Sequence, residues 1–268
     1  MSLLAELTAG AVEDAEARRA VRSTSEVERD AEAQPPALDA FDALRPGPRV
    51  RIIAEVKRAS PSRGDLASIP DPAFQASRYE TGGASAISVL TEQRRFKGSL
   101  EDLSAVKAAV TVPVLRKDFV ATPYQVIEAR AAGADIVLLI VAALEQRVLE
   151  ELYALTVELG MTPLVEAHTA VEVARAADLG ARLIGVNARD LTTFELDRDL
   201  FGRLVEGIPS DAVKIAESAV LQPSDVEHYR RAGADAVLIG EALVTGDPVA
   251  TLGAFIAAGD ATAGEESS

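Results

Sequence analysis

The residues Glu55-Val56-Lys57 place a carboxylate and an ammonium two positions apart, at the end of the apolar run 50–56. Because side chains alternate along a strand, both charges point to the same face of it. Charges on the core-facing side of a strand are costly unless they are paired or used. The spacing therefore indicates either a structural ion pair or one corner of an acid–base site. The Ser60-Pro61-Ser62 turn beyond them offers hydroxyl and backbone donors.

The elements that would position this pair repeat along the chain. A Gly-Ala dipeptide followed by an apolar run occurs at Gly83, Gly133, Gly180 and Gly233, each time after an Ala-rich stretch of helical periodicity. This order is typical of a helix that ends at a C-cap glycine and leads into a buried strand. Four more apolar runs alternate with these segments, at 50–56, 112–115, 163–165 and 213–216.

Helical patterns separate the apolar runs, at 72–79, 100–109, 123–131, 145–159, 170–177, 199–205, 223–231 and 248–258. Buried strands that alternate with helices in this way predict an α/β fold, a single parallel (βα)8 or TIM barrel. A doubly wound sheet is the alternative, but it normally has fewer strands and a glycine-rich phosphate loop after the first one. No such loop follows Val56.

The predicted barrel spans residues 49–258, and residues 1–48 precede it as a helical extension and loop. The extension divides into an amphipathic helix over 1–22, a polar linker or exposed loop over 23–36 and a short helix over 38–45. Residues 259–268 are small and acidic, so we expect a flexible tail there.

Composition excludes several classes of function. The chain has no cysteine and only two histidines, His168 and His228, which lie far apart. Disulfides, thiolate chemistry and zinc sites are therefore not expected, and we predict no metal and no cofactor. A net charge of −15 without a cluster of Lys and Arg disfavours nucleic acid and anionic membranes as partners. Without a signal sequence or a long apolar run, we expect a cytoplasmic, soluble protein.

Active sites of barrels lie at the C-terminal ends of the strands. The residues at these predicted ends include Glu55, Lys57, Ser60, Arg116, Lys117, Asp118, Glu166, His168, Asn187, Arg189, Asp190, Glu217, Ser218, Gly240 and Glu241, most of them polar. The opposite ends carry mostly Gly-Ala or Thr-Pro. Two lysines and three glutamates therefore converge on one mouth, which predicts an active site.

This set of residues favours general acid–base catalysis. It lacks the parts of a hydrolytic triad, and lysines interleaved with carboxylates disfavour a two-metal cage. We expect apolar surroundings to raise the pKa of Glu166 and to lower that of a lysine, which would then donate a proton near neutral pH. A Schiff base on a strand lysine stays open. Ser218-Ala219 and Gly240-Glu241 follow strands seven and eight, where barrels commonly bind phosphate.

At these residues the chain resembles the indole-3-glycerol phosphate synthase family. The matching segments run through residues 50–245 in the family's order: Ile53-Ala54-Glu55-Val56-Lys57-Arg58, Ser60-Pro61-Ser62, Ser88-Val89-Leu90-Thr91-Glu92, Phe96-Lys97-Gly98-Ser99, Leu115-Arg116-Lys117-Asp118-Phe119, Leu164-Val165-Glu166, Gly185-Val186-Asn187-Ala188-Arg189-Asp190-Leu191, Ala216-Glu217-Ser218 and Gly240-Glu241-Ala242-Leu243. Any one segment is weak, but together they are highly specific. The family also caps its barrel with an N-terminal helix.

The resemblance implies a lyase of tryptophan biosynthesis, which closes 1-(2-carboxyphenylamino)-1-deoxyribulose 5-phosphate to the indole with loss of CO2 and water and without a cofactor. It implies that Lys117 is the general acid at the ribulose carbonyl, that Lys57 holds the substrate carboxylate and that Glu166 is the base of the dehydration. It also implies that Glu55, Asn187 and Glu217 orient the lysines and the ribulose hydroxyls, and that Phe96 and Phe119 line a pocket for the anthranilate ring. Arg189 would make a further contact with the substrate. The implied phosphate site consists of Ser60, Ser218, Ala219, Gly240 and Glu241.

One departure concerns Ala219, where the family usually has glycine. The alanine keeps its N–H donor, so phosphate binding there survives if φ is negative, whereas a positive φ would cost about 1 kcal/mol. Two alternative functions stay open, namely another phosphate-binding barrel isomerase or aldolase and a catalytically silent barrel. We expect a small phosphorylated substrate as the partner and a monomer, with weak association with other tryptophan-pathway enzymes as an open alternative.

Overall fold

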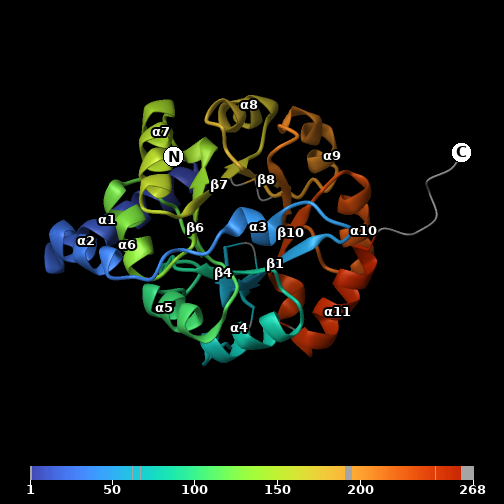
Figure 1. Ribbon diagram of the computed structural model, residues 1–268, viewed down its shortest axis with the longest axis horizontal. Coiled ribbons are helices and arrows are strands. Elements are labelled where there is room, and N and C mark those ends of the chain that lie inside the picture. The colour runs from blue at the N-terminus through green and yellow to red at the C-terminus, as the bar shows by residue number, and fades with distance from the viewer. Residues whose placement is uncertain (1, 62, 67, 191–194, 245, 261–268) are drawn as a thin grey trace, which may run out of the picture.

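The computed structural model describes residues 2–61, 63–66, 68–190, 195–244 and 246–260. Parallel strands close into a barrel in the order β1-β10-β9-β8-β7-β6-β5-β4, and helices surround it (Figure 1). The strands are β1 Arg51–Val56, β4 Ala86–Leu90, β5 Val114–Lys117, β6 Ile136–Ile140, β7 Thr162–Ala167, β8 Leu183–Asn187, β9 Val213–Glu217 and β10 Ala236–Ile239. The predicted (βα)8 barrel is confirmed.

The helical patterns of the sequence all correspond to helices outside the barrel. These are α4 Pro72–Thr81, α5 Leu100–Ala109, α6 Pro123–Ala131, α7 Gln146–Glu158, α8 Ala170–Asp178, α9 Leu200–Leu204, α10 Pro223–Arg231 and α11 Pro248–Ala258, with the short 3-10 turns η1 Val141–Ala143, η2 Val205–Gly207 and η3 Glu241–Leu243. Local chemistry sets their starts. At α4, for example, Asp71 accepts a hydrogen bond from the backbone N–H of Phe74, and Pro72 occupies the first turn.

Each strand is apolar on both faces, because one face packs on helices and the other fills the barrel. In β1, Ile52 and Ala54 belong to the outer layer, and Ile53 belongs to the interior. The interior also takes Leu115, Leu164 and Ile215 from other strands. This filling gives the site a rigid floor.

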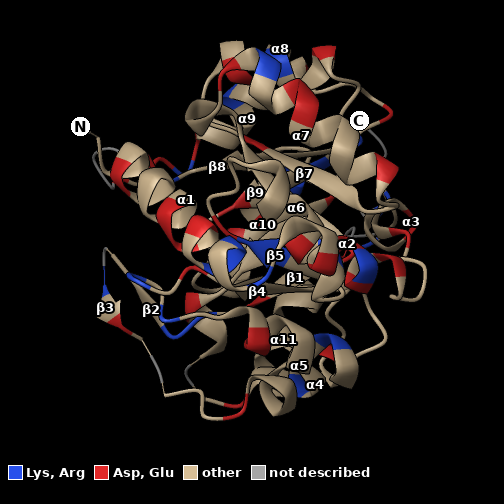
Figure 2. Cartoon of the chain, turned by 90° about the vertical axis from the view of Figure 1, so that its left-hand side faces the viewer, with Lys and Arg blue, Asp and Glu red and all other residues tan. Residues whose placement is uncertain are grey.

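Two N-terminal helices lie at opposite ends of the barrel, as Figure 2 shows. Helix α1 Leu3–Val21 lies over the end where the strands terminate, and Leu4 and Leu7 pack into the interior cluster there. The short α3 Ala40–Leu44 lies at the other end, where the Arg182 guanidinium stacks 3.7 Å from the Phe41 ring centroid. The barrel is therefore covered at both ends.

The prediction of a linker or exposed loop over 23–36 was wrong, because α2 Thr24–Glu32 forms there. Ser23 and Glu26 make a reciprocal capping box that starts the helix. Val27 and Ala31, four residues apart on one face, are buried in a cluster with residues of α6. Two buried positions are enough to dock this strongly charged helix, and their spacing of four residues was the available signal.

A chain of ion pairs connects α1 to strand β5. Arg18 Nε donates to Glu128 Oε1 at 2.6 Å, and Arg116 Nη1 donates to Glu128 Oε2 at 3.0 Å. Arg116 is fully buried and also pairs with Asp118 at 3.0 Å. The two partners of Arg116 thus hold the segment that contains Lys117.

Two further segments flank the barrel, one after β1 and one after α11. A small antiparallel hairpin, β2 Ala59–Ser60 and β3 Gly64–Asp65, projects at the same end as α1 (Figure 2). At the far end of the chain, the Val50 N–H donates to the Gly259 carbonyl at 3.1 Å, and Arg49 pairs with Asp260 at 2.9 Å. The first two residues of the predicted tail are therefore attached to the barrel, whereas residues 261–268 lie outside the described residues.

Candidate active site

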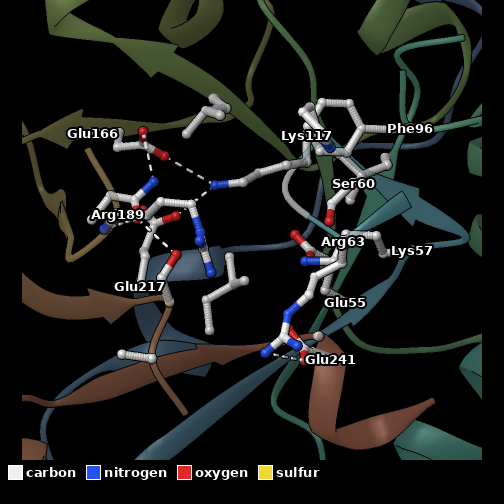
Figure 3. Close-up of a pocket in the computed structure, with 18 of the residues that line it drawn as sticks. Glu55, Lys57, Ser60, Arg63, Phe96, Lys117, Glu166, Arg189, Glu217 and Glu241 are labelled. Carbon is white, nitrogen blue, oxygen red and sulfur yellow. Dashed lines mark hydrogen bonds and ion pairs between the residues drawn. The ribbon is translucent and has the colours of Figure 1, made fainter. Parts of the chain in front are cut away.

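One cavity opens at the C-terminal ends of the strands, and residues of α1 and of the β2–β3 hairpin contribute to its lining. Figure 3 shows the side chains that line it. Every residue that the sequence analysis assigned to a site lines this cavity. They are Glu55, Lys57, Ser60, Phe96, Lys117, Phe119, Glu166, Asn187, Arg189, Glu217, Ser218, Ala219, Gly240 and Glu241. The structure thus brings together residues from strand ends far apart in the chain.

The charged side chains at the base of the cavity form one layer of the barrel interior. Each follows an inward-facing apolar residue by two positions, and the set comes from alternate strands of the closed order, β1, β5, β7 and β9. The members are Glu55, Lys117, Glu166 and Glu217. Barrels of this type stack their interior in such layers of alternate strands. One ammonium therefore shares a layer with three carboxylates, each of which is at most 2% exposed.

Lys117 lies between two of these carboxylates. Its Nζ donates to Glu217 Oε2 at 2.5 Å and to Glu166 Oε2 at 3.0 Å. Glu217 can approach because residue 185 on β8 is glycine: a Cβ there would lie 2.1 Å from Glu217 Oε1. Gly185 is therefore part of the site through its missing side chain.

The pKa values in this cluster differ from the sequence-based expectation. Burial alone would lower the pKa of Lys117, but Glu166, Glu217 and Glu55 outweigh burial and raise it. Burial alone would raise the pKa of Glu166, but Lys117 and His168 outweigh burial and lower it. Both expectations, a lowered lysine pKa and a raised pKa for Glu166, were wrong because the opposite charges lie in direct contact.

Glu217 has the opposite shift from Glu166. Burial and the neighbouring Glu166 carboxylate raise the pKa of Glu217, against the effect of Lys117. The contacts explain the difference: Glu166 also accepts a hydrogen bond from Asn187 Nδ2 at 3.2 Å, whereas Glu217 Oε1 is buried without a hydrogen-bond partner. Of these two carboxyl groups, Glu217 is therefore the one that takes up a proton more readily as pH falls.

Glu55 and Lys57 form an ion pair at the end of β1. Glu55 is buried, and the Lys57 side chain is 20% exposed and lines the cavity. A Cβ at residue 240 would lie 2.5 Å from Glu55 Oε2 and 3.0 Å from Lys57 Nζ, so Gly240 leaves room for the pair. Figure 3 shows this pair and the Lys117 cluster as separate groups that face a common space.

A hydrogen-bonded chain orients the rim between β8 and β9. The Ser218 hydroxyl donates to Asn187 Oδ1 at 2.7 Å, and the Arg189 backbone N–H donates to the same oxygen at 3.0 Å. These two contacts fix the Asn187 amide, whose nitrogen then faces Glu166. The Ser218 hydroxyl is thus engaged with the site's polar network.

The backbone at Ser218 and Ala219 is left-handed, with φ values of 69° and 60°. The positive φ at Ala219 answers the question that the sequence left open. An L-residue other than glycine pays about 1 kcal/mol for this conformation, because its Cβ crowds the following carbonyl. The backbone at Ala219 is therefore strained, and this residue lies at the rim of the cavity.

Apolar residues line another part of the cavity. The Phe96 and Phe119 rings lie with centroids 6.1 Å apart and planes inclined at 43°. Leu7 from α1, with Leu138 and Ile140 from β6, adds to this apolar wall. Sequence reasoning missed these three; the signals were the period-two pattern of β6 and the apolar face of the first helix.

Arg63 was also missed. It lines the cavity from the β2–β3 turn, and its guanidinium pairs with Glu241 Oε1 at 3.1 Å (Figure 3). A basic residue three positions after Ser60, in the turn that follows the first strand, was the available signal. Arg63 places an accessible cation at the rim near Gly240.

Two features are absent from the described part of the chain. No group of three His, Cys, Asp or Glu side chains there is arranged to hold a metal ion. Among the same residues, no helix combines the length and apolar character needed to cross a membrane.

The fold and site define a (βα)8-barrel enzyme with an acid–base cluster at the C-terminal mouth. Similar barrels include 3-hexulose-6-phosphate synthase from Salmonella typhimurium, with a TM-score of 0.64 at 15% identity over 78% of this chain and 98% of that one. The thiamine phosphate pyrophosphorylase from Pyrococcus furiosus gives a TM-score of 0.58 at 14% identity over 82% of this chain and 97% of that one. At these identities the similarity concerns the fold alone.

The chain belongs to the indole-3-glycerol phosphate synthase family, whose model matches residues 4–252. The synthase of Leifsonia xyli subsp. xyli is 71% identical over 255 residues, which cover 95% of this chain and 98% of the relative. The synthase of Mycolicibacterium gilvum is 58% identical over 259 residues, or 96% of this chain and 95% of the relative. The family resemblance drawn from the motifs is therefore confirmed.

Proposed function

We propose that the two lysines and the glutamates of the cavity carry out the family's reaction as acid, base and substrate-holding groups. This decarboxylating lyase of tryptophan biosynthesis closes 1-(2-carboxyphenylamino)-1-deoxyribulose 5-phosphate to indole-3-glycerol phosphate, with loss of CO2 and water. The observation that carries the assignment is the layer in which Lys117 contacts both Glu166 and Glu217.

Lys117 is the proposed general acid at the ribulose carbonyl. When the aromatic ring attacks that carbon, the carbonyl oxygen becomes an alkoxide, which is far more basic than an amine. A lysine whose pKa is raised still gives up its proton to such an oxygen. The contacts with Glu166 and Glu217 keep Lys117 charged until that moment.

Glu166 is the proposed base of the dehydration. Lys117 and Asn187 hold its two oxygens, which fixes the carboxylate toward the cavity. Once Lys117 has given its proton to the substrate, Glu166 loses its strongest cationic partner and becomes more basic. Glu217 keeps Lys117 in place, and Asn187 orients Glu166.

Lys57 is the proposed partner of the substrate carboxylate. It is the second ammonium of the cavity, and Glu55 holds it there while its side chain remains partly exposed. The apolar wall of Phe96, Phe119 and Leu7 suits the anthranilate ring. Placing the ring on this wall holds the reacting carbon near the carbonyl.

The proposed phosphate site is the rim formed by Ser60, Ser218, Ala219, Gly240 and Glu241. The small side chains there let a phosphate approach the backbone. The Arg63 guanidinium, which pairs with Glu241, would supply a cation for the phosphate by pairing with it in place of Glu241. Arg189, whose backbone is tied to Asn187, is a further proposed substrate contact.

The test is a fluorescence assay for the indole product, with purified protein and the carboxyphenylamino substrate. Steady product formation is expected, and no product at high enzyme concentration would refute the assignment. Borohydride trapping separates the aldolase alternative: a covalent adduct of substrate on Lys57 or Lys117 would indicate a Schiff base.

We propose further that the working unit is a cytoplasmic monomer. One chain supplies the whole described lining of the cavity, so acid, base and substrate-holding groups need no second copy. Light scattering at assay concentration tests this, and a dimer as the only active species would refute it.

A further inference from the structure

His168 lies directly after β7, is partly buried and has no role in the mechanism above. Its side chain is 13% exposed, and both ring nitrogens are buried without a hydrogen-bond partner. Buried polar atoms in folded proteins nearly always have partners, so the ring requires an explanation.

The two ring nitrogens face two carboxylates. Nε2 lies 3.5 Å from Glu166 Oε1, and Nδ1 lies 3.4 Å from Glu172 Oε2. These are ion-pair distances, and hydrogen bonds in substrate-free sites are often long. Only a protonated ring carries a donor on each nitrogen. The arrangement therefore suits an imidazolium between two carboxylates.

Helix α8 fixes the outer carboxylate. Glu172 Oε2 accepts a hydrogen bond from the His168 backbone N–H at 2.7 Å, and the Glu172 N–H donates to the N-cap residue Thr169 at 3.2 Å. Helix capping alone would account for Glu172. It does not account for the orientation of Nε2 toward the proposed base.

We propose that His168, held by Glu172, is a positioning residue for Glu166 and supports its carboxylate through the oxygen that Lys117 does not contact. Lys117 pairs with Oε2, whereas Asn187 and His168 face Oε1. The inference rests on the proposed role of Glu166 as the base. After Lys117 has given up its proton, His168 is the cation that still faces Glu166.

The charges around the ring keep it protonated. Burial lowers the pKa of His168, but Glu172, Glu166 and Glu217 together outweigh burial and raise it. The opposing cation is Lys117, which pairs with the other oxygen of Glu166 at 3.0 Å. Loss of the His168 proton at high pH would therefore remove support from the base.

The chain offers a direct test, because it has only two histidines. Proton NMR of the imidazole rings as a function of pH, with His228→Gln to assign the signals, should show His168 titrating above an ordinary histidine. Glu172→Gln keeps an acceptor for the cap but removes the charge, and it should lower that midpoint. A His168 midpoint at or below the ordinary value would overturn the proposal, even if no His168 variant folds.

The second arm is the pH dependence of kcat for indole formation in the wild type, His168→Gln and His228→Gln. His228 is a matched control, since it pairs with Asp199 at the surface. We expect kcat of His168→Gln to fall by roughly tenfold, less than the 10²–10⁴-fold expected for loss of the base itself. The acidic limb of its profile should move to higher pH, while His228→Gln keeps the wild-type profile.

A purely structural role would give a different result. His168→Gln would then melt at a lower temperature but keep the shape of the wild-type pH profile, which would overturn the proposal. Absence of product from the wild type would instead refute the proposed function, and the NMR titration would still measure the ion pairs of His168.

Discussion

Lys117 Nζ lies 3.0 Å from Glu166 Oε2, so the proposed acid and the proposed base of the reaction are paired with each other. Besides each other, Lys117 contacts Glu217, and Glu166 contacts Asn187 and faces His168. The ammonium has three N–H donors and the two carboxylates take two of them, so the third is available for the substrate carbonyl. Transfer of the proton to substrate then frees the base for the next step.

Removal of Lys117 should abolish most of the chemistry. We expect Lys117→Ala to lower kcat by roughly 10²–10⁴-fold, the usual effect of losing a general acid. Lys214→Ala, which removes a lysine near the N-terminal end of β9, is the control and should keep its kcat. A largely retained kcat in Lys117→Ala would indicate that Lys57, and not Lys117, is the general acid.

Gly185→Ala tests the close approach of Glu217. The new Cβ would lie 2.1 Å from Glu217 Oε1, so the carboxylate must move away from Lys117. We expect a loss of about 1–3 kcal/mol in stability, as for other overpacked interiors, together with a reduced kcat. Gly202→Ala, where the nearest atom would be 3.6 Å away, is the control. Thermal melts and the indole assay measure both effects.

Ala219→Gly should relieve the strain at the rim. Because φ is 60° there, removal of the methyl should raise the free energy of unfolding by up to about 1 kcal/mol. Ala216→Gly, in strand β9, should instead lower it by about 0.5–1 kcal/mol. Denaturant titration compares the two. A destabilised Ala219→Gly would show that the left-handed backbone is not strained.

Much of this site could be predicted because strand periodicity is regular. Glu55, Lys117, Glu166 and Glu217 stand two positions after inward-facing apolar residues, so their common layer follows from the barrel itself. The pKa values could not be predicted, since they depend on which atoms touch. The roles of Gly185 and Gly240 were also hidden, because an absent side chain matters only when its neighbours are known.

Arg116 should matter more for stability than its distance from the substrate suggests. Its guanidinium is fully buried and pairs with Asp118 and Glu128, at 3.0 Å each. Arg116→Met keeps the volume but leaves both carboxylates without this cation, so we expect a loss of roughly 3–5 kcal/mol. Arg94→Ala, which removes ion pairs at the surface between the β4–α5 loop and α1, should change stability far less, because water screens these charges. Equal losses in the two variants would contradict the buried network.

The raised pKa of Glu217 should appear as a pH dependence of stability. Burial and the Glu166 charge raise this pKa, so the folded protein holds a proton that the unfolded chain has already released. The stabilisation is complete below the unfolded pKa and is lost as pH rises through the folded pKa. Glu217→Gln cannot titrate, so the wild type should lose stability relative to it between the ordinary carboxyl pKa of 4.5 and the folded pKa of about 7.

Thermal melts across this range measure the difference between the two proteins. Glu158→Gln, which removes an exposed carboxylate at the end of α7, should run parallel to the wild type. If the wild type instead gained stability relative to Glu217→Gln as pH rose, Glu217 would be ionised in the folded protein. Lys117 would then face two charged carboxylates throughout this pH range.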